Sequence, residues 1–115
     1  MDRRRMARVY AALGNEVRLR IVELVSAHRE MCVCELVDQL GMSQANISRH
    51  VGILRDAGLL QDRKVGAWVL LRVDEDALHD ALGRAILMVR EAHRASAQMD
   101  PEKRLAGRCE VAHAE

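Results

Sequence analysis

Apolar residues recur along this chain with two different periods, and the changes of period separate predicted helices from predicted strands. Up to residue 57 the apolar positions are three or four residues apart, which is typical of one face of a helix. Residues 59–73 instead form two short strand-like runs around Val65-Gly66-Ala67, and the helical spacing returns after residue 74. The pattern therefore predicts four helices, a hairpin with Gly in its turn, and one long helix.

Glycine and capping residues define the ends of these helices. Gly14 and Gly41 are suited to end the first and third helices, because Gly adopts the left-handed conformation freely. Asn15, Ser43 and Asp74 are suited to cap the second, fourth and last helices. The predicted elements are helices at 6–13, 16–28, 33–40 and 44–57, strands at 59–64 and 68–73, and a helix from 75 to about 98.

The order of these elements predicts a winged helix. The third and fourth helices are joined only by Gly41-Met42-Ser43, which makes a helix-turn-helix with a short turn. A basic hairpin directly after the second of these helices is typical of a wing. The predicted class is mainly α (α+β), with one domain over residues 1–98 and a mobile tail over 99–115 that carries Cys109.

Composition excludes several classes of protein. The 115 residues allow one domain, and 50% apolar with 30% charged residues indicates a soluble, globular chain. No apolar run approaches the roughly 18 residues of a membrane span, and no signal peptide follows the basic N-terminus, so we expect a cytoplasmic protein without a membrane partner. Three cysteines do not make a disulfide framework, and metal binding or redox sensing is their more natural use.

Charge is segregated although the net charge is only +1. Residues 43–72 hold five Arg or Lys against two Asp, whereas residues 74–82 hold four acids and no base. A basic middle in a neutral chain is typical of a local nucleic-acid footprint, and solvated helix faces are the alternative.

The fourth helix carries polar side chains near its start, where a recognition helix meets base edges in the major groove. Gln and Asn can bond adenine, and Arg can bond guanine. On the hairpin, basic side chains suit phosphates or the minor groove. The alternatives are that Ser43 only caps the helix, that Asn46 and Arg49 only face solvent, and that His50 is structural. The predicted DNA-binding residues are Ser43, Gln44, Asn46, Ser48, Arg49, His50, Arg63 and Lys64.

Three stretches resemble the ArsR/SmtB family of metal-responsive repressors. They are Ser43-Gln44-Ala45-Asn46-Ile47-Ser48-Arg49-His50-Val51, then Leu54-Arg55-Asp56-Ala57-Gly58-Leu59-Leu60, and the wing-like Asp62-Arg63-Lys64-Val65-Gly66-Ala67-Trp68-Val69. Asn15-Glu16 stands where Asp-Pro is commoner in that family. The resemblance covers about residues 6–90. It implies a homodimer, formed through the first and last helices, that binds a palindromic DNA operator and leaves it when an inducer binds; intramolecular packing is the alternative for these helices.

Cys32 and Cys34 open the third helix, where the helix N-terminus lowers a thiol pKa and favours the thiolate that binds soft metals. Residues two apart lie about 200° apart around a regular helix. To hold one ion, Cys32 must therefore precede the helix, or the first turn must unwind. Ligation would then distort the start of the helix that positions the recognition helix. The alternative is two buried cysteines that act as small apolar residues.

The Cys32-Val33-Cys34 motif resembles that of arsenic-sensing family members, which often have a third Cys where this chain has Val37. As(III) and Sb(III) prefer three thiolates, so the predicted ligands are Cys32, Cys34 and Cys109. Without Cys109, a two-thiolate site with water or hydroxide remains. A cadmium- or lead-type sulfur site stays open, with His28 as a possible extra ligand. A zinc site at Asp76 and His79 is disfavoured by its spacing.

Three functions compete at this point. The main prediction is a repressor relieved by As(III) or Sb(III). The second is a thiol-redox or persulfide sensor of the same fold, in which Cys109 must take part because we expect a direct Cys32–Cys34 disulfide to be strained. The third is a thiol metal carrier that does not bind DNA. No set of nucleophile, base and orienting group is evident, so we predict no enzymatic activity.

Overall fold

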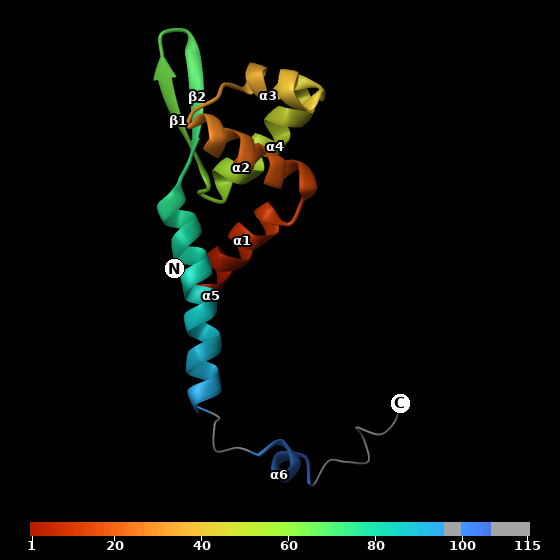
Figure 1. Ribbon diagram of the computed structural model, residues 1–115, viewed down its shortest axis with the longest axis vertical. Helices are drawn as coiled ribbons and strands as arrows, with labels where there is room; N and C mark the ends of the chain where they lie inside the picture. Colours follow the sequence, from red (N-terminus) through yellow and green to blue (C-terminus); the bar gives the residue numbers. More distant parts are fainter. Residues whose placement is uncertain (96–99, 107–115) are drawn as a thin grey trace. The chain divides into compact units, whose positions relative to one another are not determined.

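The computed structural model describes residues 1–95 and 100–106, and its elements follow the predicted order (Figure 1). Among the described residues, 1–83 form one compact unit and those from residue 84 onward belong to a second. The boundary predicted at residue 98 lies outside the described residues. The elements are α1 (Arg3–Leu13), α2 (Glu16–His28), α3 (Val33–Leu40), α4 (Gln44–Asp56), β1 (Leu60–Val65), β2 (Trp68–Val73), α5 (Glu75–Ala95) and α6 (Pro101–Leu105).

The predicted caps form. Asn15, Ser43 and Asp74 each accept a hydrogen bond from the backbone N–H three residues ahead, at 3.1, 3.2 and 3.1 Å. Gly41 adopts the left-handed conformation at φ +65° and ends α3 as predicted. In the helix-turn-helix, Gly41 therefore ends α3 and Ser43 starts α4, while Asn15 and Asp74 start α2 and α5.

The helix α6 was not predicted. Asp100 accepts a hydrogen bond from the N–H of Glu102 at 3.0 Å, and Pro101 occupies the first turn, where its missing N–H costs nothing. The pair Asp100-Pro101 carries the local signal for this start, because Asp is suited to cap a helix and Pro to its first turn.

The core of the first unit is aliphatic. The predicted stripe of α4, Ile47, Val51 and Leu54, is buried. It packs with buried side chains of α1, α2, α3 and the hairpin, and each such side chain stabilises the fold by about 1.5–3 kcal/mol. This packing holds α4 by one face and leaves its other face outward. The buried partners with no exposed area include Val9, Ile21, Val25, Leu36 and Leu71.

The hairpin confirms the predicted wing, with β1 starting and ending one residue later than expected. The strands are antiparallel, and their register runs from Leu60 opposite Val73 to Val65 opposite Trp68. Gly66 in the turn has φ +60°, a conformation that favours Gly. The chain is thus a winged helix. In the described part of the chain, no helix is long and apolar enough to cross a membrane.

Candidate nucleic-acid interface and cysteine site

The start of α4 presents a continuous polar surface. Ser43, Gln44, Asn46, Ser48 and Arg49 are all exposed. Because residues three or four apart share a helix face, Gln44 lies beside Ser48 and Asn46 lies beside Arg49, and all of them lie outside the buried stripe of α4. The structure therefore brings together five of the eight predicted DNA-binding residues on one helix.

Two exposed basic side chains, one on this surface and one on the wing, have no ion-pair or hydrogen-bond partner among the described residues. Arg49 on α4 and Lys64 on β1 make no ion pair or side-chain hydrogen bond with any described residue, and both are exposed. By contrast, Arg63 bonds Glu30 through two nitrogens, at 2.9 and 2.6 Å. These hydrogen bonds lower the pKa of Glu30 and raise that of Arg63. Arg49 and Lys64 are thus free to bind an anion. Arg63 must first give up its hydrogen bonds to the carboxylate of Glu30.

His50 does not belong to the exposed surface. Only 7% of it is exposed, and its Nδ1 lies 3.2 Å from a terminal nitrogen of Arg18. A guanidinium only donates hydrogen bonds, so Nδ1 accepts and the ring is neutral. Burial, then the charges of Arg18 and Arg49, lower the pKa of His50. This geometry favours the alternative that His50 has a structural role. It does not favour the prediction that His50 contacts DNA.

Arg18 is a positioning residue that the sequence analysis missed. Its guanidinium donates to the carbonyl oxygens of Ala12 at 2.6 Å and Ala11 at 3.3 Å, in addition to its contact with His50. One side chain on α2 thus connects the end of α1 to the middle of α4. No sequence signal could have identified this role, since the partners belong to other helices.

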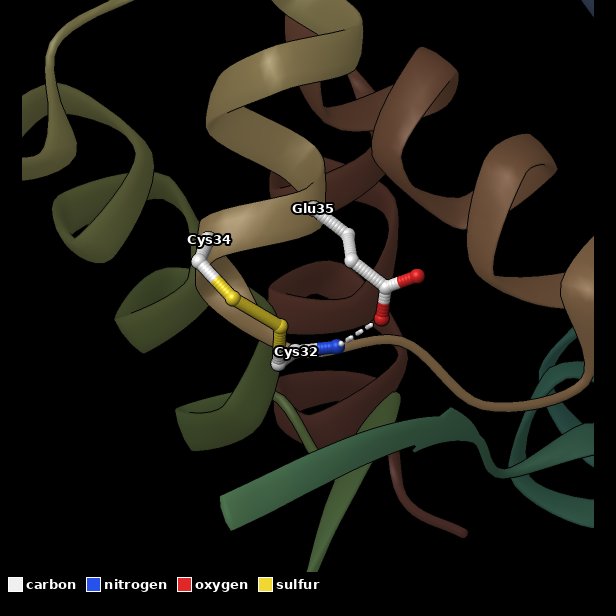
Figure 2. The surroundings of a disulfide bond; sticks show 3 residues. All are labelled: Cys32, Cys34 and Glu35. Carbon is white, nitrogen blue, oxygen red and sulfur yellow. Dashed lines mark hydrogen bonds between the residues drawn. A yellow bond between two sulfur atoms is a disulfide. The ribbon is translucent and has the colours of Figure 1, made fainter.

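The cysteine pair lies at the start of α3 (Figure 2). Cys32 is the N-cap, with extended backbone at φ −88° and ψ 163°, so it precedes the helix as one of the two predicted arrangements requires. Its N–H donates to Oε1 of Glu35 at 3.0 Å. Cys32 is only 7% exposed, whereas Cys34 in the first turn is exposed. One sulfur is therefore sheltered and the other open to solvent.

Cys32 and Cys34 are joined by a disulfide, which corrects the expectation that such a bond needs Cys109. The physical reason is that the extended conformation of Cys32 takes it off the helical spiral. Its Cα lies 5.4 Å from that of Cys34, within the usual range for disulfides. The same closeness lets the two sulfurs, once reduced, approach a single ion.

The described residues offer no third ligand. Within residues 1–95 and 100–106, no group of three or more His, Cys, Asp or Glu side chains is placed to hold a metal ion. His28 is exposed, and its Nδ1 lies 2.9 Å from the carbonyl oxygen of Leu24. Cys109 lies outside the described residues, so its role as a ligand stays a prediction.

Comparison with known families places this geometry in context. Residues 15–62 match the family described as "Bacterial regulatory protein, arsR family". The matched stretch begins at the cap of α2 and ends in β1, so it contains both the cysteine pair and the polar start of α4.

Two curated relatives carry the comparison further. The "Arsenical resistance operon repressor" of Escherichia coli strain K12 is 49% identical over 65 residues, which is 56% of this chain and 56% of the relative. The chain thus matches only about half the length of that relative. A "Cadmium resistance transcriptional regulatory protein CadC homolog" of Staphylococcus aureus is 30% identical over 86 residues, 75% of this chain and 71% of the relative.

A solved structure shares the fold. The homodimeric winged helix-turn-helix DNA-binding domain Mb0332 from Mycobacterium bovis, described as a possible ArsR-family transcriptional regulator, is 28% identical. Its TM-score is 0.60, and the match covers 84% of this chain and 86% of that one.

Proposed function

Because this chain belongs to the arsR family of bacterial regulatory proteins, we propose that it is a DNA-binding repressor that leaves its operator when As(III) or Sb(III) binds Cys32 and Cys34. The observation that supports the proposal is the position of the cysteine pair relative to the helix-turn-helix. A soft-ligand pair at the start of α3 adjoins a helix whose exposed start has the chemistry of a recognition helix.

The DNA contacts follow from the exposed side chains. Gln44, Asn46 and Arg49 present amide and guanidinium groups that can read base edges, and Lys64 adds a charge on the wing for a phosphate. Ser43 at the helix N-terminus is suited to a phosphate oxygen. A homodimer would place two such helices about one DNA turn apart on a palindromic site.

An apolar stripe on α5 supports the homodimer. Leu82, Ile86 and Val89 are three or four residues apart and are 50%, 55% and 65% exposed. The stripe of α1 is different, since Met6 and Val9 are buried in the core of their own unit. Of the two terminal helices in the predicted interface, α5 therefore supplies the open apolar surface.

The inducer chemistry requires the dithiol. Two equivalents of a cellular thiol supply the two electrons and two protons that open the Cys32–Cys34 disulfide, and they become joined as a disulfide of their own. Each thiol then replaces one oxygen ligand of arsenite, forming an As–S bond and releasing one water. The thiol of Cys109 supplies the predicted third sulfur. The helix N-terminus favours the thiolate of each residue of the pair.

A second candidate, a thiol-redox repressor, is favoured by the disulfide itself. In that function an oxidant such as hydrogen peroxide takes two electrons from the dithiol, and the disulfide replaces the bound metalloid as the signal. The name of the Staphylococcus aureus relative also keeps cadmium among the inducers to be compared.

A titration separates these functions. The reduced protein is bound to fluorescent DNA from its own promoter region, and anisotropy is followed as arsenite, antimonite, cadmium, zinc or peroxide is added. The proposal expects release by arsenite and antimonite. Release by peroxide alone supports the redox function, and release by cadmium but not arsenite changes the inducer. Equal binding under every condition contradicts the proposed function.

A further inference from the structure

Three consecutive residues, Glu30, Met31 and Cys32, connect the cysteine site to the wing, and they are termed the linking segment here. Glu30 bonds Arg63 of β1 through both carboxylate oxygens. Met31 exchanges two backbone hydrogen bonds with Leu71 of β2, at 3.0 and 2.7 Å. Cys32 then caps α3. The linking segment is thus hydrogen-bonded to both strands of the wing, and its last residue is the N-cap of α3.

The linking segment is held firmly along its length. Met31 and Leu71 are both buried, so their bridge is shielded from water. The Glu30–Arg63 pair is bidentate, which fixes its geometry, and the Glu30 side chain is only 27% exposed. Since a closely packed interior transmits a displacement, a shift of Cys32 reaches its neighbours rather than ending at a loose loop.

We propose that Glu30 is a positioning residue that couples the cysteine site to the wing, by holding Arg63 to the segment that starts at Cys32. The proposal rests on the proposed function. When Cys32 takes a ligand, the linking segment moves with it. The Met31–Leu71 bridge and the Glu30–Arg63 pair then shift the wing, which carries Arg63 and Lys64 toward or away from phosphate.

This coupling is a second path from sensor to DNA. The first path runs from α3 to α4 through the helix-turn-helix. The second leaves α3 at its N-cap and reaches β1 and β2 without passing through α4. Energetically the Glu30–Arg63 pair is a surface ion pair that adds little stability. Its effect is therefore expected in the response to inducer and not in folding.

The operator test uses a matched control. E30Q removes one negative charge and the bidentate ion pair with Arg63, since an amide retains only one acceptor oxygen for the guanidinium. D62N removes the same charge beside Arg63, where Asp62 bonds Arg55 of α4 at 3.0 Å, and leaves the linking segment intact. For each variant, operator affinity is measured with and without arsenite, and arsenite affinity is measured by calorimetry.

The decisive quantity is the operator affinity without arsenite divided by the operator affinity with arsenite. We expect E30Q to lower this ratio about three- to tenfold relative to D62N, with unchanged arsenite affinity. An E30Q ratio equal to that of the wild-type chain overturns the proposal. So does an equal loss in D62N, because that result assigns the effect to the lost charge or to any lost ion pair of the wing, and not to the linking segment.

A second measurement does not depend on DNA. In NMR spectra of the reduced protein, the Leu71 amide and the Arg63 Nε–H are followed as arsenite is added, or as diamide closes the disulfide when arsenite does not bind. We expect both signals to move in the wild-type chain and in D62N, and the Arg63 signal to lose its response in E30Q. Unmoved signals overturn the proposal. Moved signals without operator release contradict the proposed function instead, and leave the link between cysteines and wing standing.

Discussion

Helices α3 and α4 both begin after a residue with extended backbone, Cys32 at φ −88°, ψ 163° and Ser43 at φ −62°, ψ 152°. Ser43 caps its helix with its own hydroxyl, at 3.2 Å from the N–H of Asn46. At Cys32 the bond runs the other way, since Glu35 reaches back to the backbone of the cap. The sulfur of Cys32 is bonded to that of Cys34, while the hydroxyl of Ser43 serves as the cap.

The surroundings of the two helix starts differ in the same direction. At the start of α4 the side chains of Gln44 and Asn46 are exposed, so they are open to an external partner. The start of α3 is bonded to both strands of the wing through the linking segment. The start of α4 is therefore open to a partner, whereas the start of α3 is tied to the wing.

The largest effect is expected from a substitution at the exposed start of α4. Arg49→Ala removes an exposed, unpaired guanidinium from each recognition helix, and we expect a loss of about 1–3 kcal/mol of operator binding per helix. Anisotropy on operator DNA measures the loss, and circular dichroism checks that the fold is retained. Unchanged affinity would remove Arg49 from the interface.

The next largest effect is expected from a substitution at the start of α3. Cys34→Ser removes the exposed thiol, and we expect operator binding to persist while the response to arsenite disappears, a coupling of about 1–3 kcal/mol in regulated proteins. The same anisotropy titration measures both. Normal release of the Cys34→Ser protein by arsenite would show that the cysteine mechanism is wrong.

A smaller effect tests the cap of α4. Ser43→Ala removes the hydrogen bond to the N–H of Asn46, and we expect a loss of about 1 kcal/mol in the free energy of unfolding. Urea denaturation measures it, with Ser48→Ala as the control because Ser48 is exposed within the helix. An equal loss in both variants would contradict the assignment of Ser43 as a cap.

The smallest effect concerns pH. The pKa of His50 lies below 6.5 in the folded protein and returns to about 6.5 in the unfolded chain. Between these values the unfolded chain binds more protons, so the free energy of unfolding falls as the pH is lowered through this range. We expect His50→Gln, which can still accept from Arg18, to reduce that dependence in urea titrations at pH 5 and 7. An identical slope would exclude His50 as its source.

Much of the fold was predictable because it depends on local signals. Helix α3 occupies the predicted residues 33–40, since Gly41 ends it and the start follows from its apolar pattern. The five exposed residues at the start of α4 were also predicted, because a polar cap followed by a buried stripe determines which side chains face outward.

The remainder depended on contacts between distant residues. Arg63 and Glu30 are 33 residues apart, and Arg18 and His50 are 32 apart, so no local pattern relates them. The Cys32–Cys34 disulfide was misjudged for another reason. The expectation of strain rested on the separation of two residues alone, whereas the extended backbone of Cys32 brings its Cα to 5.4 Å from that of Cys34.

The unequal exposure of the two sulfurs has a kinetic consequence. In the proposed function, a metalloid meets the exposed Cys34 before Cys32, which is only 7% exposed, so capture is sequential: a first bond forms at the surface and ring closure follows. Only that closure pulls on the N-cap. A compound able to form one sulfur bond but not two would therefore occupy the protein without triggering it, and would act as an antagonist.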